Sequence, residues 1–412
     1  MRHSPINIAI VMLNTAFMVF PSSYQWMKAG YLLAFACIFI LLWYGNRIEL
    51  SRDILFIFLV AITLGMFLNL YDLYENGEGF VTIKIYVLDV LAYLLVVAVL
   101  SSLPDLRSIL SGTMYLASLV ISLNIVAFIL CSSRGIQYPL EFLDLDYRIG
   151  FDERGFLAYS TNNLPVLIFT IPYMVADLFL AHRGLKSKKA ILALSIIAGL
   201  LSLRTALIAT MLASMVVFYL YGELAVRKRY VRLLAVLATI MVMAGFSPLL
   251  WKSDMAQGIY QLKIADKLSG DDYRFMQARI WADFIKTAPL LGHGTSSMRL
   301  EADKDGMVTS KGKIDNPYGY ELSWLRRIAL TGAIPTAIYT VMLLYLAGQL
   351  MVQGAGENRR AALGLLGGLL AFIVADNTNG YLETFGYLWV IFFPAAFVSC
   401  CRLTGTEHEL PA

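Results

Sequence analysis

An almost continuous apolar run at residues 190–221, with basic residues at both ends, constrains the fold of this chain more than any other feature. As one straight helix the run would be about 48 Å long, well over the roughly 30 Å hydrocarbon core of a bilayer. A single crossing would also leave one basic cluster outside, whereas cytoplasmic loops are the ones that collect Lys and Arg. We therefore expect a hairpin of two short spans with both clusters in the cytoplasm. The clusters are His182, Arg183, Lys186, Lys188 and Lys189 upstream, and Arg227, Lys228, Arg229 and Arg232 downstream.

The turn of this hairpin puts an arginine at the outer end of two membrane spans. Its sequence is Ser202-Leu203-Arg204-Thr205-Ala206. An arginine at that depth is costly unless it has an anionic partner or lies in a wet cavity. The turn around Arg204 is therefore the first candidate site.

The composition is that of a multi-pass membrane protein. Of 412 residues, 58% are hydrophobic and only 15% are charged, unlike any soluble domain of this length. The net charge of +4 comes mostly from the loops, so we expect no nucleic-acid partner. The cysteines and histidines are too scattered to predict a disulfide framework, a metal site or a cofactor, and the sequence has no phosphate-loop, dinucleotide or Ser-His-Asp motif. These residues are Cys37, Cys131, Cys400, Cys401, His3, His182, His293 and His408.

Apolar runs predict twelve membrane spans. They occupy about residues 6–20, 27–44, 53–71, 83–100, 109–131, 161–181, 190–202, 205–221, 233–250, 319–350, 361–375 and 385–401. The first run resembles a signal peptide, but the many later spans favour an uncleaved helix. An even number of spans puts both termini on one side. Lys and Arg in the loops of that side outnumber those in the short loops opposite more than twofold, so we expect both termini to be cytoplasmic.

The expected fold class is therefore an all-α integral membrane protein in three parts. Residues 1–250 hold nine spans, with short loops and an outer segment at 132–160. Residues 251–318 form one large outer segment, and residues 319–412 hold three spans and a cytoplasmic tail. Loops this long are usually functional where they are retained. Within the large outer segment we expect a helix through 273–287 that ends at Pro289, before a flexible Gly292-His293-Gly294 turn.

Arginines gather in the predicted outer segments, with carboxylates and aromatic residues between them. A guanidinium presents a planar fork of donors that matches phosphate oxygens, and several forks near a membrane surface suit a lipid-linked diphosphate. The alternative is that the loop arginines are solvated or paired with a nearby Asp, as Arg279 and Asp283 would be at i,i+4 spacing. The candidate arginines are Arg204, Arg274, Arg279, Arg148 and Arg154.

Three residues in or just after the large outer segment are candidate general bases: Asp315 and Glu321, near the start of the next span, and His293. Each has a structural alternative. Asp315 and Glu321 would otherwise be surface caps, and His293 a polar residue of a turn. The last outer turn, which begins at Asp376, is expected to be a polar loop, with sugar contact as the alternative.

Four features in the order of the chain resemble a known family. They are the short hairpin around Arg204, a large outer segment after two further spans, and an arginine, Arg274, some fifteen residues before Pro289-Leu290-Leu291-Gly292-His293-Gly294. The fourth is Asn316, which precedes a helix with a downstream Gly332. The order is similar to that of the O-antigen polymerase/ligase family of bacterial surface polysaccharide assembly, which comprises Wzy-type polymerases and the related ligases. The resemblance covers about residues 185–350.

The resemblance implies a metal-independent membrane glycosyltransferase of GT-C-like architecture at the periplasmic face of the bacterial inner membrane. Its substrate would be an oligosaccharide repeat unit on undecaprenyl diphosphate, and its product O-antigen or an exopolysaccharide. Arg204 and Arg274 would bind the lipid diphosphate, helped by Arg279, Arg148 or Arg154. A chain-length-determinant protein is the further partner that the resemblance implies.

Ligases of the family carry a histidine just before the asparagine, where this chain has Asp315. The difference favours a polymerase, and it leaves the base open among Asp315, Glu321 and His293. One alternative is an O-antigen ligase that transfers polymer to lipid A-core. The alternative of another class is a flippase for lipid-linked oligosaccharides. A flippase is expected to hold its charges in a central cavity, whereas here they gather in the outer segments.

Overall fold

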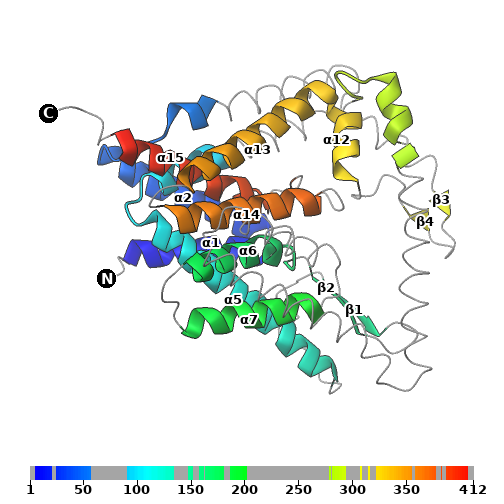
Figure 1. Ribbon diagram of the computed structural model, residues 1–412, viewed down its shortest axis with the longest axis horizontal. Coiled ribbons are helices and arrows are strands. Elements are labelled where there is room, and N and C mark those ends of the chain that lie inside the picture. The colour runs from blue at the N-terminus through cyan, green and yellow to red at the C-terminus, as the bar shows by residue number, and fades with distance from the viewer. Residues whose placement is uncertain are drawn as a thin grey trace.

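The computed structural model describes residues 5–20, 25–56, 91–133, 147–151, 157–161, 163–180, 186–201, 278–279, 281–293, 307–308, 314–315, 322–354, 358–376, 382 and 387–406. These residues form a bundle of α-helices with two short hairpins at one end (Figure 1). The helical class is confirmed, and the two hairpins are additions to the all-α class expected from the sequence.

The described helices fall on predicted apolar runs, whereas the runs at 205–221 and 233–250 and most of the run at 53–71 lie outside the described residues. The helices are α1 (Pro5–Val19), α2 (Gln25–Tyr44), α5 (Leu106–Ser133), α6 (Val166–Leu180), α7 (Lys186–Leu201), α12 (Ser323–Thr331), α13 (Ala333–Gln353), α14 (Arg359–Asp376) and α15 (Trp389–Thr406). A further apolar helix spans Leu91–Ser101. The run at 319–350 differs from the expectation, because it divides into α12 and α13 at Gly332.

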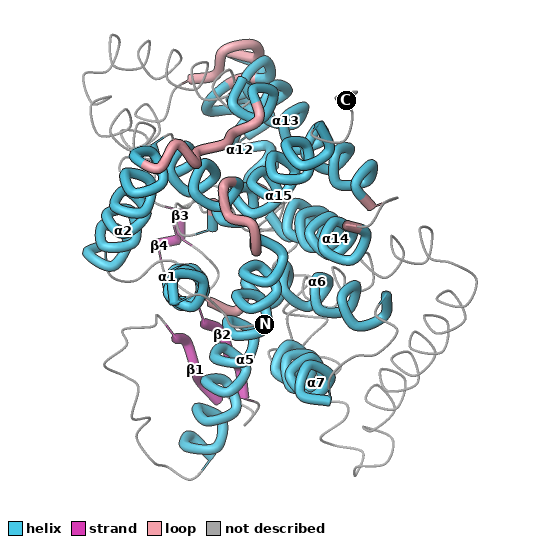
Figure 2. The backbone as a smooth tube through the Cα atoms, turned by 90° about the vertical axis from the view of Figure 1, so that its left-hand side faces the viewer, coloured by secondary structure: helices cyan, strands magenta, loops and turns pink. Residues whose placement is uncertain are grey.

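Three helices in the described ranges are long and apolar enough to cross a membrane: Trp26–Tyr44, Leu106–Ala127 and Ala333–Gln353. Helix α2 lies at the edge of the bundle (Figure 2) and exposes large apolar side chains, among them Leu33 and Leu41. An exposed apolar surface of this extent is what a lipid-facing helix presents.

The centre of the bundle is the contact between α6 and α14. Two glycines one helical turn apart, Gly364 and Gly368, lie against Tyr173 and Phe169 of α6. A Cβ atom at Gly368 would come within 2.8 Å of the Phe169 ring. Small residues at i,i+4 spacing let two helix backbones approach closely, as in membrane helix pairs. Trp389 of α15 completes this core, with its ring centroid 5.1 Å from that of Phe169.

Charged side chains join the helices at one end of the bundle. Lys188 Nζ lies 2.7 Å from Asp177 Oδ2, which also accepts a hydrogen bond of 2.9 Å from the Tyr115 hydroxyl. This cluster joins the start of α5, the end of α6 and the start of α7. At the same end, Asn7 of α1 donates to Asp105, just before α5.

The start of α1 and the end of α15 lie at the same end of the bundle, on the left in Figure 1. Both hairpins, α12 and the segment 281–293 lie at the opposite end. Strand β1 (Tyr147–Phe151) pairs antiparallel with β2 (Leu157–Thr161), and β3 (Met307–Val308) with β4 (Ile314–Asp315). The hairpins therefore belong to the two segments that the sequence places outside the membrane.

The predicted membrane hairpin at 190–221 lies only partly within the described residues. Helix α7 ends at Leu201 and is its first arm. The turn with Arg204 and the second arm lie outside the described residues.

Candidate functional site

The end of the bundle opposite the termini carries the sequence-predicted site residues that the structure describes. Arg148 is in β1, opposite Ser160, and Asp315 is in β4, opposite Met307. Arg279 and His293 belong to the segment that packs beside α12. β1 lies in the lower part of this end and α12 in the upper part, in both views (Figures 1 and 2).

The other predicted site residues lie outside the described residues. They are Arg204, Arg274, Arg154 and Glu321.

Residues 281–293 of the large outer segment dock onto the junction of α12 and α13 through backbone hydrogen bonds. The Ala333 N–H donates to the Pro289 carbonyl (2.9 Å), and the Ile334 N–H donates to the Leu290 carbonyl (3.3 Å). The turn thereby caps the first two amides of α13, which have no partner within the helix. In return the His293 N–H donates to the Ala329 carbonyl near the end of α12 (3.0 Å).

Two glycines face each other where this turn meets the helix junction, and we call this contact the glycine clasp. Gly292 and Gly332 have φ angles of 72° and 88°. A Cβ atom at Gly292 would lie 2.2 Å from the Leu330 carbonyl oxygen, and one at Gly332 equally close to the Leu290 carbonyl oxygen. Only glycine meets both requirements, since other residues avoid positive φ and carry a Cβ. The Pro289-Leu290-Leu291-Gly292 turn thus joins the outer segment to the α12–α13 junction.

A small hydrophobic core, separate from that of the bundle, lies beneath this contact. Trp281 is fully buried there against Ala329 and Leu330 of α12. Phe284, Ile285, Leu322 and Leu325 pack around it. The helix 281–287 is thus fixed to α12 by side chains as well as by backbone, and it holds the neighbouring Arg279 at this end of the bundle.

His293 lies with its ring edge-on to Phe284, with centroids 5.2 Å apart. Its Nε2 atom is 2.9 Å from the Phe284 carbonyl oxygen and 2.8 Å from Thr287 Oγ1. Because a carbonyl oxygen only accepts, Nε2 carries the proton in this arrangement. The contacts correspond to the turn-residue alternative, and a role for His293 as base stays a prediction.

Arg279 is exposed near the start of this helix. The carboxylate of Asp283 pairs with Lys286 at 2.8 Å, at i,i+3 spacing, rather than with Arg279. This hydrogen bond and the positive charge of Lys286 lower the pKa of Asp283, and the charge of Arg279 adds a smaller effect. Arg279 therefore forms no ion pair with Asp283 at i,i+4 spacing, and it affects the pKa of Asp283 only through its charge.

Two arginines that the sequence analysis left out lie on α12. Arg327 stacks over the ring of Tyr339, with its guanidinium carbon 4.0 Å from the centroid, and Trp324 lies 5.8 Å away. Arg326 precedes it on the same short helix. The signal was available in the sequence, since the pattern Ser-Trp-Leu-Arg-Arg-Ile is amphipathic rather than apolar.

Asp376, which the sequence predicts to begin a polar loop, is instead the last residue of α14. It is only 1% exposed at the end of α14. Its carboxylate accepts a hydrogen bond from the Leu382 N–H (2.8 Å), and Ser323 Oγ at the start of α12 contacts both its carboxylate and its carbonyl. Asp376 therefore joins α12 to α14 from within.

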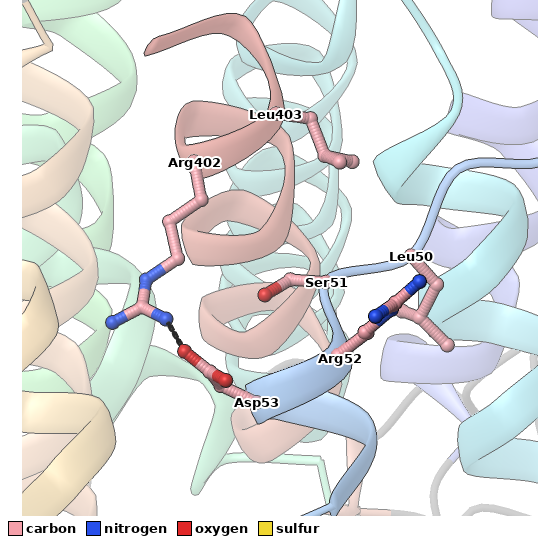
Figure 3. Close-up of a pocket in the computed structure, with 6 residues that line it drawn as sticks. All are labelled: Leu50, Ser51, Arg52, Asp53, Arg402 and Leu403. Atoms are coloured by element: carbon pink, nitrogen blue, oxygen red, sulfur yellow. Dashed lines mark hydrogen bonds and ion pairs between the residues drawn. The ribbon is translucent and has the colours of Figure 1, made fainter. Parts of the chain in front are cut away.

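A pocket of about 460 Å³ (Figure 3) lies beside the end of α15, which Figure 1 shows at the end of the bundle where the termini are. Its Arg402 is bonded to Asp53 and donates to Gln349 (3.0 Å), so this guanidinium is used within the protein. The pocket is lined by Leu50, Ser51, Arg52, Asp53, Arg402 and Leu403. It is distinct from the candidate site.

Within the described ranges, no group of three or more His, Cys, Asp and Glu side chains is arranged to hold a metal ion. Neither a comparison with protein-family models nor one with curated proteins finds a match to this chain.

Proposed function

We propose that this chain is an integral-membrane polysaccharide polymerase at the periplasmic face of a bacterial inner membrane. It would extend glycan chains from oligosaccharide repeat units carried on undecaprenyl diphosphate. The observation that carries the proposal is the docking of residues 281–293 onto the α12–α13 junction, at the end of the bundle opposite the termini. A rigid outer segment at the end of a membrane bundle suits a reaction at the membrane surface.

The topology belongs to the same proposal. Twelve spans would place both termini in the cytoplasm, in agreement with the start of α1 and the end of α15 at one end of the bundle. The clusters around Lys188 and Arg402 would then face the cytoplasm, where basic residues are preferred.

The reaction needs a lipid diphosphate as the leaving group and a sugar hydroxyl as the nucleophile. The hydroxyl oxygen attacks the anomeric carbon of the donor, the bond from that carbon to the diphosphate oxygen breaks, and the hydroxyl proton passes to a base. Since diphosphate is already a good leaving group, the protein contributes mainly by orienting the reactants and neutralising the developing charge.

In this scheme Arg204 and Arg274 bind the diphosphate, with Arg279 and Arg148 as helpers. Asp315 or Glu321 accepts the proton. Asp315 lies in β4, on the same end of the bundle as the docked segment that Arg279 precedes.

Deletion of this gene alone, followed by gel analysis of cellular polysaccharide, tests the proposal. Single repeat units on the lipid acceptor with loss of long chains are expected. Long chains that persist on undecaprenyl diphosphate but never reach lipid A would instead identify a ligase. Loss of translocation without loss of chain extension in proteoliposomes would identify a flippase.

The variant Arg204→Ala sharpens the test, because the proposal assigns the lipid diphosphate as the anionic partner of this arginine. We expect no polymer from this variant at normal protein abundance. The matched control is Arg360→Ala, an exposed arginine at the start of α14, which should leave polymer length unchanged. Near-normal polymer from Arg204→Ala would rule out the assigned role.

A further inference from the structure

The tip of the docked outer segment is an exposed apolar turn. Leu290 is 59% exposed and Leu291 is 52% exposed, and Pro289 beside them is also exposed. Large apolar side chains in a row on a water-facing loop are unfavourable, and such a patch generally marks a contact surface.

The turn continues an apolar stripe on α13. Ile334, bonded through its N–H to the Leu290 carbonyl, is 43% exposed in the first turn of that helix. Val341 and Leu344, seven and ten residues from Ile334, lie on the same face and are more than 60% exposed. Since α13 is long and apolar enough to cross a membrane, this stripe fits lipid chains, and the leucine tip extends it beyond the start of the helix.

The backbone of the tip has most of its acceptors satisfied, which entry into lipid requires. The Pro289 and Leu290 carbonyls accept from the first amides of α13, and the Ala288 carbonyl accepts from the Gly292 N–H (3.1 Å). Proline has no N–H to lose. Backbone polar groups without a hydrogen-bond partner are costly in a bilayer core. These hydrogen bonds therefore lower the free-energy cost of inserting the turn.

A charged layer precedes the tip. Asp283 and Lys286 form an ion pair on the exposed face of the helix that leads into it. A charged helix followed by an apolar turn matches the order of headgroups and acyl chains across a membrane surface.

We propose that the Pro289–Leu291 turn inserts into the membrane leaflet at the α12 end of the bundle and contacts lipid acyl chains. It would thus anchor the outer segment beside α13 and keep helix 281–287 at headgroup depth. The proposal concerns membrane contact only and holds whichever reaction the protein catalyses.

Site-specific photocrosslinking tests it. A diazirine-bearing aliphatic amino acid is introduced at Leu290, or at Leu291, in the full chain in liposomes of phosphatidylethanolamine and phosphatidylglycerol. Both side chains are exposed, so the replacement leaves the fold intact. Lipid adducts are then measured by mass spectrometry. The same amino acid at Leu344 serves as the lipid-facing reference, and at Lys286 as the headgroup-level control.

The expected result is a lipid-adduct yield at Leu290 or Leu291 close to that at Leu344 and severalfold above that at Lys286. Yields at both leucines no higher than at Lys286 would overturn the proposal, since water would then surround the tip. Adducts to protein in place of lipid would also overturn it, because the turn would then bind a second copy or another protein. Lack of lipid adducts at Leu344 would overturn the proposal as well, because the stripe that the tip continues would then not contact lipid.

Discussion

The α6–α14 contact in the centre of the bundle and the glycine clasp at the end opposite the termini both depend on two glycines, but for different physical reasons. Gly364 and Gly368 lie in ordinary helical backbone and make room for the rings of α6. Gly292 and Gly332 are needed for their positive φ angles as well as for close backbone approach. The first contact joins two buried helices, whereas the second joins residues 281–293 to the start of α13, which is long and apolar enough to cross a membrane.

The difference predicts which part of the structure unfolds when each contact is lost. The central contact lies within one large core that includes α6, α14 and α15, so its loss affects the whole bundle. The clasp lies over a separate small core around Trp281, so its loss should free residues 281–293 while the bundle stays folded.

The largest effect is expected from Gly368→Leu. The new side chain has no room beside Phe169, and overpacking of this kind costs about 3 kcal/mol. Thermal unfolding of the purified protein in detergent should show a clear fall in Tm. Gly348→Leu is the matched control, because nothing lies within 4 Å of a Cβ atom at Gly348 of α13. Equal Tm values for the two variants would mean that α6 and α14 are not closely packed.

A smaller and more local effect is expected from Gly332→Ala. The backbone there has φ 88° and ψ 167°, a region open almost only to glycine, which costs about 2 kcal/mol for other residues. The added Cβ would also meet the Leu290 carbonyl oxygen. Hydrogen exchange should become faster in 281–293 and stay unchanged in α6 and α14. Exchange that rises equally in both regions would show that the two contacts are one cooperative unit. Gly30→Ala, on open surface of α2, is the control.

The smallest effect is expected at the Asp283–Lys286 pair, which lies in the outer segment but on its solvated face. Lys286→Ala should raise the pKa of Asp283 towards its usual value, because Lys286 is the largest cause of the lowered pKa. A lowered pKa contributes stability above the unfolded-state value and loses it as pH falls through the folded one. Since Asp283 is fully exposed, solvent screening removes nearly all of this contribution. Thermal scans at neutral and acid pH should give the same Tm difference between variant and parent, and a difference that disappears in acid would contradict this.

The sequence predicts the helices well but the joints between them poorly. Apolar runs identify α1, α2, α5 and α7 because membrane-spanning length and hydropathy are local properties. Local hydropathy does not predict the break at Gly332, because the break depends on contact with Gly292, which is forty positions away. The burial of Asp376 was missed for a similar reason, because its partner Ser323 is distant in the chain.

The candidate site is predictable to a lesser degree. The sequence locates the outer segments, and Arg148, Arg279, His293 and Asp315 do lie on elements at one end of the bundle. It does not give the docking of 281–293 on α12, because the backbone bonds and the Trp281 core join residues that are about forty positions apart in the chain. Nor does local spacing decide that Asp283 pairs with Lys286, since i,i+3 and i,i+4 partners compete.

The glycine clasp also closes a loop of the chain between residues 292 and 332. Gly292 and Gly332 are in contact, and the β3–β4 hairpin with Asp315 belongs to the stretch between them. When both ends of a segment are fixed, the groups on that segment have a higher effective concentration near the point of closure than when only one end is fixed. In the proposed reaction the clasp would raise the effective concentration of the Asp315 carboxylate at this end of the bundle, and opening the clasp would lower it.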